Sequence, residues 1–271
     1  MDDLFGPEQA ARWIAVPGPD DDKYTRGVVG FVTGSAQYPG AAVLGVEAAA
    51  RTGVGMIRYL GTGRPTRLVL ARRPEAVTVD GRVQAWVLGS GQDAAQRDER
   101  TAGWLKAALA QEVPVVIDAG ALDLHDRAAG PALLTPHAGE LAKAVGRPVE
   151  QVRADPEGAA RAAAASLGAT VLLKGHTTHV ATPDGGMLRV RNAPSWLATA
   201  GAGDALAGIL GALLATHAKR IADEPETIAP LAATGAVLHG LAAERASAGG
   251  PLTVLDLAAE LPRVIAGLLA A

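Results

Sequence analysis

The sequence predicts an α/β fold with a mostly parallel central sheet and helices on both faces. Apolar segments of strand length alternate with segments of helical pattern along the 271 residues. Most strand segments are apolar throughout rather than at every second residue, which is typical of strands covered on both faces. Each polar motif of the chain directly follows one of these strands, and open α/β sheets bind their ligands at that edge.

The expected elements begin after a polar, proline-containing stretch, residues 1–25, which we interpret as an approach segment. The expected strands cover 27–32, 54–60, 83–88, 113–117, 132–134 and 169–173, with a hairpin of 178–181 and 187–191 around a Pro-Asp-Gly-Gly turn. The expected helices cover 41–52, 98–110, 149–166, 204–217, 227–247 and 256–269. No internal repeat or low-complexity linker interrupts this order, so we expect a single domain over residues 1–271.

The composition excludes several classes of function. The net charge is −3 and aromatic residues make up 3% of the chain, which argues against nucleic acid, an anionic membrane or base-stacking platforms. The chain has no cysteine, so disulfides, thiolate catalysis and zinc–cysteine sites are excluded. The acidic N-terminus lacks an apolar signal core, and no uninterrupted apolar stretch has transmembrane length. These features predict a cytoplasmic protein.

The most informative motif is a small-residue loop, residues 199–203, that ends in Asp204 and leads into an apolar helix. Gly201 and Gly203 allow a ligand to approach the backbone, and the free amides of a helix N-terminus bind phosphate oxygens. Asp204 lies where a phosphate would arrive and can remove a proton from an attacking hydroxyl. The alternative is that Asp204 only caps the helix.

Two glycine-rich turns follow earlier strands. The first, Gly34 to Ala42, offers backbone amides, although a tight turn without a ligand explains it equally well. The second, Gly89 to Ala94, fits a relaxed dinucleotide pattern, and Asp118 at the end of the next strand could contact a ribose. An NAD-dependent oxidoreductase is therefore one alternative, and a plain glycine turn is the other.

Two further strand ends carry charged side chains. In the segment 135–140, a proline fixes the turn before His137, which can donate to an amide or phosphate, and Glu140 can hold a metal-bound water. Lys174 is followed by a glycine, a histidine and two threonines, a set that suits a nucleotide phosphate or ribose. Polar turns without a ligand are the alternative in both places. Histidines 125, 179, 217 and 239 lack metal-ligand spacing, and we interpret them as ordinary structural residues.

Together and in this order, the motifs resemble the ADP/ATP-dependent NAD(P)H-hydrate dehydratases of the ribokinase-like superfamily. The resemblance covers about residues 25–270. The matching segments are Tyr38-Pro-Gly-Ala-Ala42, Arg51-Thr-Gly-Val-Gly55, Gly89-Ser-Gly91, Leu134-Thr-Pro-His-Ala-Gly-Glu140, Val171-Leu-Leu-Lys-Gly175 and Leu197-Ala-Thr-Ala-Gly-Ala-Gly-Asp-Ala-Leu-Ala-Gly208.

The resemblance implies a ribokinase-like fold and a repair reaction on hydrated NADH or NADPH. A nucleotide, ADP in typical bacterial members, phosphorylates the ring hydroxyl, and loss of phosphate restores the reduced cofactor while AMP is released. The residues implied to line the hydrate site are Ala41, Gly91, His137 and Asp204, with Asp204 as the base. Those implied to hold the adenine nucleotide are Lys174, Gly175, His176, Thr177, Thr178 and Gly203, with Gly201 and Gly203 forming the anion hole. Mg²⁺ is expected to neutralise the phosphates, with Glu140 as a ligand through water.

Two departures from the family pattern stand out. Ala138 replaces a second proline after His137, and residues 193–196 replace a glycine-rich run, which we interpret as variation in the substrate loop. The chain is also short for the N-terminal epimerase domain of many members, which implies action on one hydrate epimer. The resemblance suggests a homo-oligomer, with a tetramer as one form. The rival functions are a small-molecule alcohol kinase of the same superfamily, the oxidoreductase, and a nucleotide sensor that needs no base.

Overall fold

A mixed eight-stranded sheet forms the centre of the protein in the computed structural model, which describes residues 4–270. The strand order is β2-β1-β3-β4-β5-β6-β7-β8; β1 to β6 pair in parallel, and the last three strands are antiparallel neighbours. The strands are β1 (Val28–Val32), β2 (Met56–Tyr59), β3 (Ala85–Leu88), β4 (Val115–Ile117), β5 (Ala132–Leu134), β6 (Thr170–Leu173), β7 (Thr178–Ala181) and β8 (Met187–Val190). The expected parallel sheet and its terminal hairpin are confirmed.

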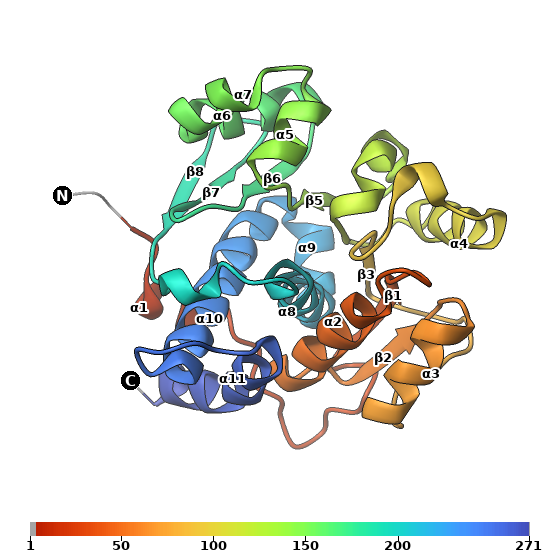
Figure 1. Ribbon diagram of the computed structural model, residues 1–271. Coiled ribbons are helices and arrows are strands. Elements are labelled where there is room, and N and C mark those ends of the chain that lie inside the picture. Colours follow the sequence, from red (N-terminus) through yellow and green to blue (C-terminus); the bar gives the residue numbers. More distant parts are fainter. Residues whose placement is uncertain (1–3, 271) are drawn as a thin grey trace.

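Helices cover both faces of this sheet (Figure 1). One face packs against α2 (Pro39–Thr52), α8 (Ala202–Thr216), α10 (Ile228–Ser247) and α11 (Val254–Leu269). The other packs against α4 (Glu99–Leu109), α5 (Ala138–Ala144), α6 (Val149–Ala154) and α7 (Pro156–Leu167). Along β1, Val29 and Phe31 belong to the first core while Val28 and Val32 belong to the second. Strands buried on both faces must be apolar throughout, which is why the strand segments do not alternate.

The first core depends on close contact between α2 and α8, which lie side by side at the centre of Figure 1. Gly208 of α8 lies against the carbonyl group of Gly45 of α2, so that a side chain at position 208 would overlap it. A Cβ atom at Gly45 would in turn lie 3.3 Å from the carbonyl oxygen of Asp204. The small residues of both helices therefore position the start of α8 over the strand ends.

The expected elements differ from the structure in a few places. The helix expected over 149–166 is two helices, because Asp155 precedes a proline and caps α7 through its carboxylate. The approach segment contains α1 (Pro7–Ala11), whose Ala10 is fully buried, and Phe5 N–H donates to the carbonyl of Arg189 in β8. The short helices α3 (Gly63–Arg72), α5 and α9 (Ala218–Asp223) were not expected; each buries too few apolar side chains to produce a periodic pattern.

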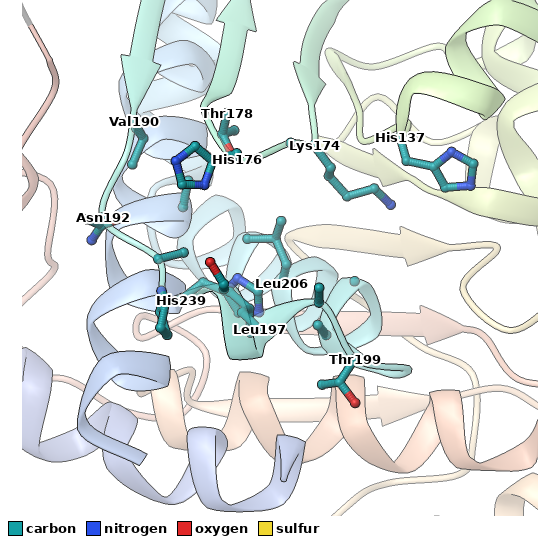
Figure 2. A pocket seen from close by; sticks show the side chains of 18 residues that line it. His137, Lys174, His176, Thr178, Val190, Asn192, Leu197, Thr199, Leu206 and His239 are labelled. Carbon is teal, nitrogen blue, oxygen red and sulfur yellow. The ribbon is translucent and has the colours of Figure 1, made fainter. Parts of the chain in front are cut away.

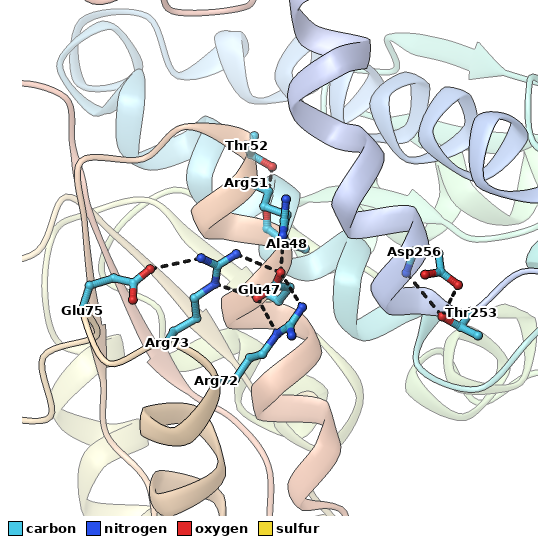
Figure 3. Close-up of polar contacts among 9 residues, drawn as sticks. All are labelled: Glu47, Ala48, Arg51, Thr52, Arg72, Arg73, Glu75, Thr253 and Asp256. Carbon is cyan, nitrogen blue, oxygen red and sulfur yellow. Dashed lines mark hydrogen bonds and ion pairs between the residues drawn. The ribbon is translucent and has the colours of Figure 1, made fainter.

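A buried ionic cluster joins α2 to α3 (Figure 3). The fully buried carboxylate of Glu47 accepts hydrogen bonds from Arg51, Arg72 and Arg73. Burial alone would raise the pKa of Glu47, but the three guanidinium groups outweigh it and lower the pKa to about 2. The charge is therefore retained in the core. Within residues 4–270, the helices are all too short or too polar to span a bilayer.

Candidate functional site

A cavity of about 770 Å³ lies at the carboxyl edge of the sheet, above the ends of β6 to β8. Its walls come from the turn between β6 and β7, the segment 192–199, the start of α8 and the middle of α10. Figure 2 shows Lys174 and His137 together at one end, and Val190 and Asn192 across the cavity from them. The cavity therefore has a charged end at the strand termini and an opposite end that is largely apolar.

Most of the residues predicted to hold the nucleotide line this cavity. Lys174, Gly175, His176, Thr178 and Gly203 all do so, and the predicted substrate residue His137 lines its charged end. The exceptions are Thr177 and Gly201, which are not among the lining residues. Gly201 instead adopts a left-handed conformation, with φ of 91°, as the residue that precedes α8.

The segment 193–196, which we interpreted as part of the substrate loop, lies along the wall of the large cavity. Ala193, Pro194 and Ser195 line the same cavity as the predicted nucleotide residues. The segment leads into a short 3-10 helix, Ser195–Leu197, that forms one wall. The chain therefore returns from β8 along this cavity before it enters α8, and the cavity also includes His137, a residue predicted to line the hydrate site.

His239 also lines the cavity, although the sequence indicated an ordinary structural histidine. It lies on α10, is 7% exposed, and its Nε2 atom has no hydrogen-bond partner among residues 4–270. Burial lowers the pKa of His239 to about 4, so the ring is neutral at physiological pH. The histidine sits in a long apolar helix, and only the packing of α10 against the site brings it to the wall.

Lys174 is tied to the sheet by a buried carboxylate. Its Nζ atom lies 2.9 Å from Asp118 Oδ1 and 3.8 Å from Glu140 Oε2. Burial would lower the pKa of Lys174, but the negative charge of Asp118, followed by that of Glu140, raises it above its usual value. The ammonium is therefore a permanent positive charge at the polar end of the cavity. A Cβ atom at Gly203 would lie 3.5 Å from it, so the start of α8 faces the same point.

Asp204 lies in the first turn of α8, three residues after the N-cap position, which Gly201 occupies. The helix has no side-chain cap hydrogen bond, so the interpretation of Asp204 as an N-cap is wrong. Burial and the neighbouring negative charge of Asp118 raise the pKa of Asp204 to about 6, against the opposing effect of Lys174. A carboxylate with such a pKa is suited to accept a proton near neutral pH.

His137 is the N-cap of α5 as well as a residue of the site. Its Nδ1 atom accepts hydrogen bonds from the backbone N–H groups of Gly139 (3.0 Å) and Glu140 (3.2 Å). A neutral ring that accepts at Nδ1 carries its proton on Nε2, which leaves a donor, and the side chain is 60% exposed. Glu140 completes a capping box by accepting from the His137 backbone N–H at 2.8 Å. The alanine at 138 leaves this geometry intact.

The two glycine turns meet at the ends of the adjacent strands β1 and β3. The N–H of Gly34 donates to the carbonyl of Ser90 at 2.7 Å, and a side chain at Gly91 would overlap the methyl group of Ala41. Gly91 has φ of 66°, a conformation that other residues rarely adopt. A second cavity, of about 400 Å³, opens beside these turns and is lined by residues that include Gln92 and Arg97.

The dinucleotide interpretation of residues 89–94 loses its basis in the structure. Asp118, the proposed ribose contact, is 3% exposed and is bonded to Ser90, Thr135 and Lys174 rather than available to a ligand. Its importance was missed because these partners lie 17 to 56 residues away in the sequence. Only the order of the strands brings them together.

Comparisons with known proteins show which family this chain resembles. A family model described as NAD(P)H-hydrate dehydratase matches residues 29–263. The chain is 37% identical to the ADP-dependent (S)-NAD(P)H-hydrate dehydratase of Neisseria meningitidis, over 83% of this chain and 79% of that protein. Its structure superposes with a TM-score of 0.86 on the ADP/ATP-dependent NAD(P)H-hydrate dehydratase of Bacillus subtilis co-crystallised with ATP/Mg²⁺, with 27% identity and 98% of each chain covered.

Longer relatives match as well. The chain is 48% identical to the bifunctional NAD(P)H-hydrate repair enzyme Nnr of Mycobacterium tuberculosis over 76% of its own length, but spans only 44% of that protein. It thus spans about half the length of such bifunctional relatives. The extent of the family match, together with the identity to the Neisseria protein, shows that the chain belongs to the NAD(P)H-hydrate dehydratase family.

Proposed function

We propose that this protein is an ADP-dependent (S)-NAD(P)H-hydrate dehydratase that repairs hydrated NADH and NADPH. One observation carries the proposal: Asp204, with its pKa near 6, lies at the start of α8 within reach of the charge of Lys174, directly after Gly203, which lines the large cavity together with Lys174. A base, a fixed cation and a helix N-terminus in one place form the set required for phosphoryl transfer to a hydroxyl.

The nucleotide occupies the large cavity in this proposal. Its base enters the largely apolar end, near Leu206 and Ala236, and its terminal phosphate reaches Lys174 and the amide of Gly203. The nicotinamide end of the hydrate lies between Asp204, His137 and the contact of Gly91 with Ala41. The remainder of this dinucleotide extends toward the second cavity, because the first is filled by ADP.

The reaction then proceeds in two steps. Asp204 takes the proton of the ring hydroxyl, the oxygen attacks the β-phosphorus of ADP, and AMP leaves with the electrons of the broken P–O bond. In the second step the ring C–O bond breaks, phosphate leaves with its electron pair, and the neighbouring ring carbon loses a proton. The new C=C bond restores NADH or NADPH, with AMP and phosphate as the other products. No oxidation or reduction takes place.

Mg²⁺ fits this site only as a partner of the nucleotide. Residues 4–270 contain no group of three or more His, Asp or Glu side chains able to hold a metal. The ion must therefore take most of its ligands from phosphate and water, with the partly exposed carboxylate of Glu140 as a contact through water. When bound, it neutralises phosphate charge during transfer. We also propose ATP as an alternative phosphoryl donor. We propose that the protein is a homo-oligomer in solution.

The test incubates the protein with NADH hydrate, Mg²⁺ and ADP or ATP, and follows the absorbance of the reduced nicotinamide ring. Recovery of absorbance together with stoichiometric AMP supports the proposal. A stable phosphorylated hydrate without recovery would instead identify a kinase, the rival function of the same superfamily. Nucleotide binding without any reaction would identify a sensor.

A further inference from the structure

Asp118 is the meeting point of four neighbouring strand ends. It directly follows β4, and its carboxylate accepts three hydrogen bonds: from Lys174 Nζ at 2.9 Å, from Thr135 Oγ1 at 2.8 Å and from Ser90 Oγ at 2.9 Å. Lys174 and Thr135 directly follow β6 and β5, and Ser90 is the second residue after β3. Since an ionised carboxylate only accepts, all three donors must point inward to it.

Each donor lies one or two residues in the sequence before a residue of the proposed site. Gly91 follows Ser90, His137 lies two residues after Thr135, and Gly175 follows Lys174. Backbone hydrogen bonds extend the connection, because the Ser90 carbonyl accepts from Gly34 and the carbonyl of Pro136 accepts from the N–H of Lys174 at 2.9 Å. One buried group therefore links the hydrate loops to the nucleotide turn.

A buried carboxylate of this kind is costly unless every lone pair finds a donor. Glu47 is a buried carboxylate of the same kind outside the site. It accepts hydrogen bonds from three arginines, and these arginines line neither of the two cavities. The partners of Asp118 instead include a lysine that lines the large cavity. Both clusters are buried carboxylates with three donors, but only the cluster of Asp118 reaches the large cavity. Glu47 is therefore a matched control.

We propose that Asp118 is a positioning residue of the reaction: it holds the Lys174 ammonium at the phosphate end of the cavity and, through Ser90 and Thr135, keeps the Gly91 and His137 loops aligned with it. Asp118 itself contacts neither substrate. The expected effects of Asp118 on the reaction rate rest on the proposed function. Its expected effect on nucleotide binding can be measured without turnover.

The main variant is Asp118→Asn, which keeps the shape of the side chain and removes its charge. ADP affinity, measured by calorimetry, is expected to fall about 10- to 100-fold, as for one lost hydrogen bond to a charged group. The turnover number is expected to fall by at least as much, because Lys174 is no longer held. The acid limb of the pH–rate profile should also move to lower pH, since the negative charge beside Asp204 is gone while Glu140 and Asp204 still support the Lys174 charge.

Ser90→Ala and Thr135→Val each remove one donor and leave the ion pair with Lys174. We expect each to raise the KM for the hydrate several-fold, by roughly the value of one neutral hydrogen bond, while the ADP affinity stays within about twofold. These variants keep the test informative if Asp118→Asn does not fold. Glu47→Gln is the control: it should lower the melting temperature without changing either ADP affinity or the pH profile.

Two results would overturn the positioning role. One is a folded Asp118→Asn variant with wild-type ADP affinity, turnover and pH profile; the other is Glu47→Gln reproducing the kinetic losses, which would mark them as a general effect of core disruption. Failure of the proposed function would be seen separately: the wild-type protein would bind ADP but would not convert the hydrate to NADH or NADPH. The calorimetric comparison of Asp118→Asn with Glu47→Gln still decides the role of Asp118 in that case.

Discussion

Gly208 of α8 packs directly against the backbone of Gly45 of α2, with no room for a side chain between them. This contact determines how closely the two helices approach at the carboxyl edge of the sheet. Asp204 lies one turn before Gly208 on the same helix, so the position of the proposed base depends on the contact.

Gly208→Ala is therefore expected to displace α8. Over-packing of a close helix contact costs about 1 to 3 kcal/mol in the free energy of unfolding, and the shift of Asp204 should reduce turnover as well. Thermal unfolding and the hydrate assay measure the two effects. Gly103→Ala in α4 is the control, since nothing lies within 4 Å of the added methyl group and helix propensity there gains about 1 kcal/mol. A Gly208→Ala protein as stable and active as wild type would contradict the assigned packing.

Asp204→Asn should abolish turnover and also stabilise the fold. The pKa of Asp204 is raised from 3.8 to about 6, so its contribution to stability is present below pH about 4 and is lost as the pH rises through about 6. The asparagine variant has no such loss, and its gain in unfolding free energy near pH 8 is on the order of 3 kcal/mol. Denaturant unfolding at pH 8 and pH 5 checks this, with the gain shrinking at the lower pH. Near-wild-type activity in this variant would exclude Asp204 as the base.

The rate of the wild-type enzyme should rise with pH through a midpoint near 6 and then level off. Only the ionised form of Asp204 can accept the hydroxyl proton, and its pKa is raised to about 6 by burial and by the charge of Asp118. The measurement is kcat/KM for the hydrate at saturating ADP over about two pH units on either side of that pKa. ADP affinity over the same range separates the titration of the nucleotide itself. A rate that does not change with pH through 6 would contradict Asp204, with its raised pKa, as the titrating base.

Two variants of His137 separate its capping role from its role in the site. His137→Ala removes both the helix cap and the Nε2 donor, whereas His137→Asn retains a side chain that caps well. Both should raise the KM for the hydrate more than the KM for ADP. Only the alanine variant should lose stability, by about 1 kcal/mol. Equal losses for the two substrates would remove His137 from the hydrate site.

Much of the fold was predictable because its signals are local. Apolar runs, interrupted in β2 by Arg58, identified the six parallel strands, and the turn residues 183–186 identified the hairpin. The strand-end rule then collected His137, Lys174 and Gly91 at one edge of the sheet. The same local signals failed where a helix buries little, as in α3, or where a proline divides an otherwise continuous helical pattern, as at Asp155.

The sequence by itself determined the alternation of strands and helices, the glycine turns and the family, because these are carried by residues adjacent in the chain. The tertiary structure decided what the buried polar groups do. The sequence placed Asp118 at a strand end but not its partners, and it gave no sign that His239 lines the cavity; both depend on how strands β3 to β6 and helix α10 meet. The tertiary structure also decided that Gly201, rather than Asp204, occupies the N-cap position of α8. The physical reason is that hydrogen bonding and desolvation of a buried side chain depend on neighbours from distant segments, which only the packed fold brings within reach.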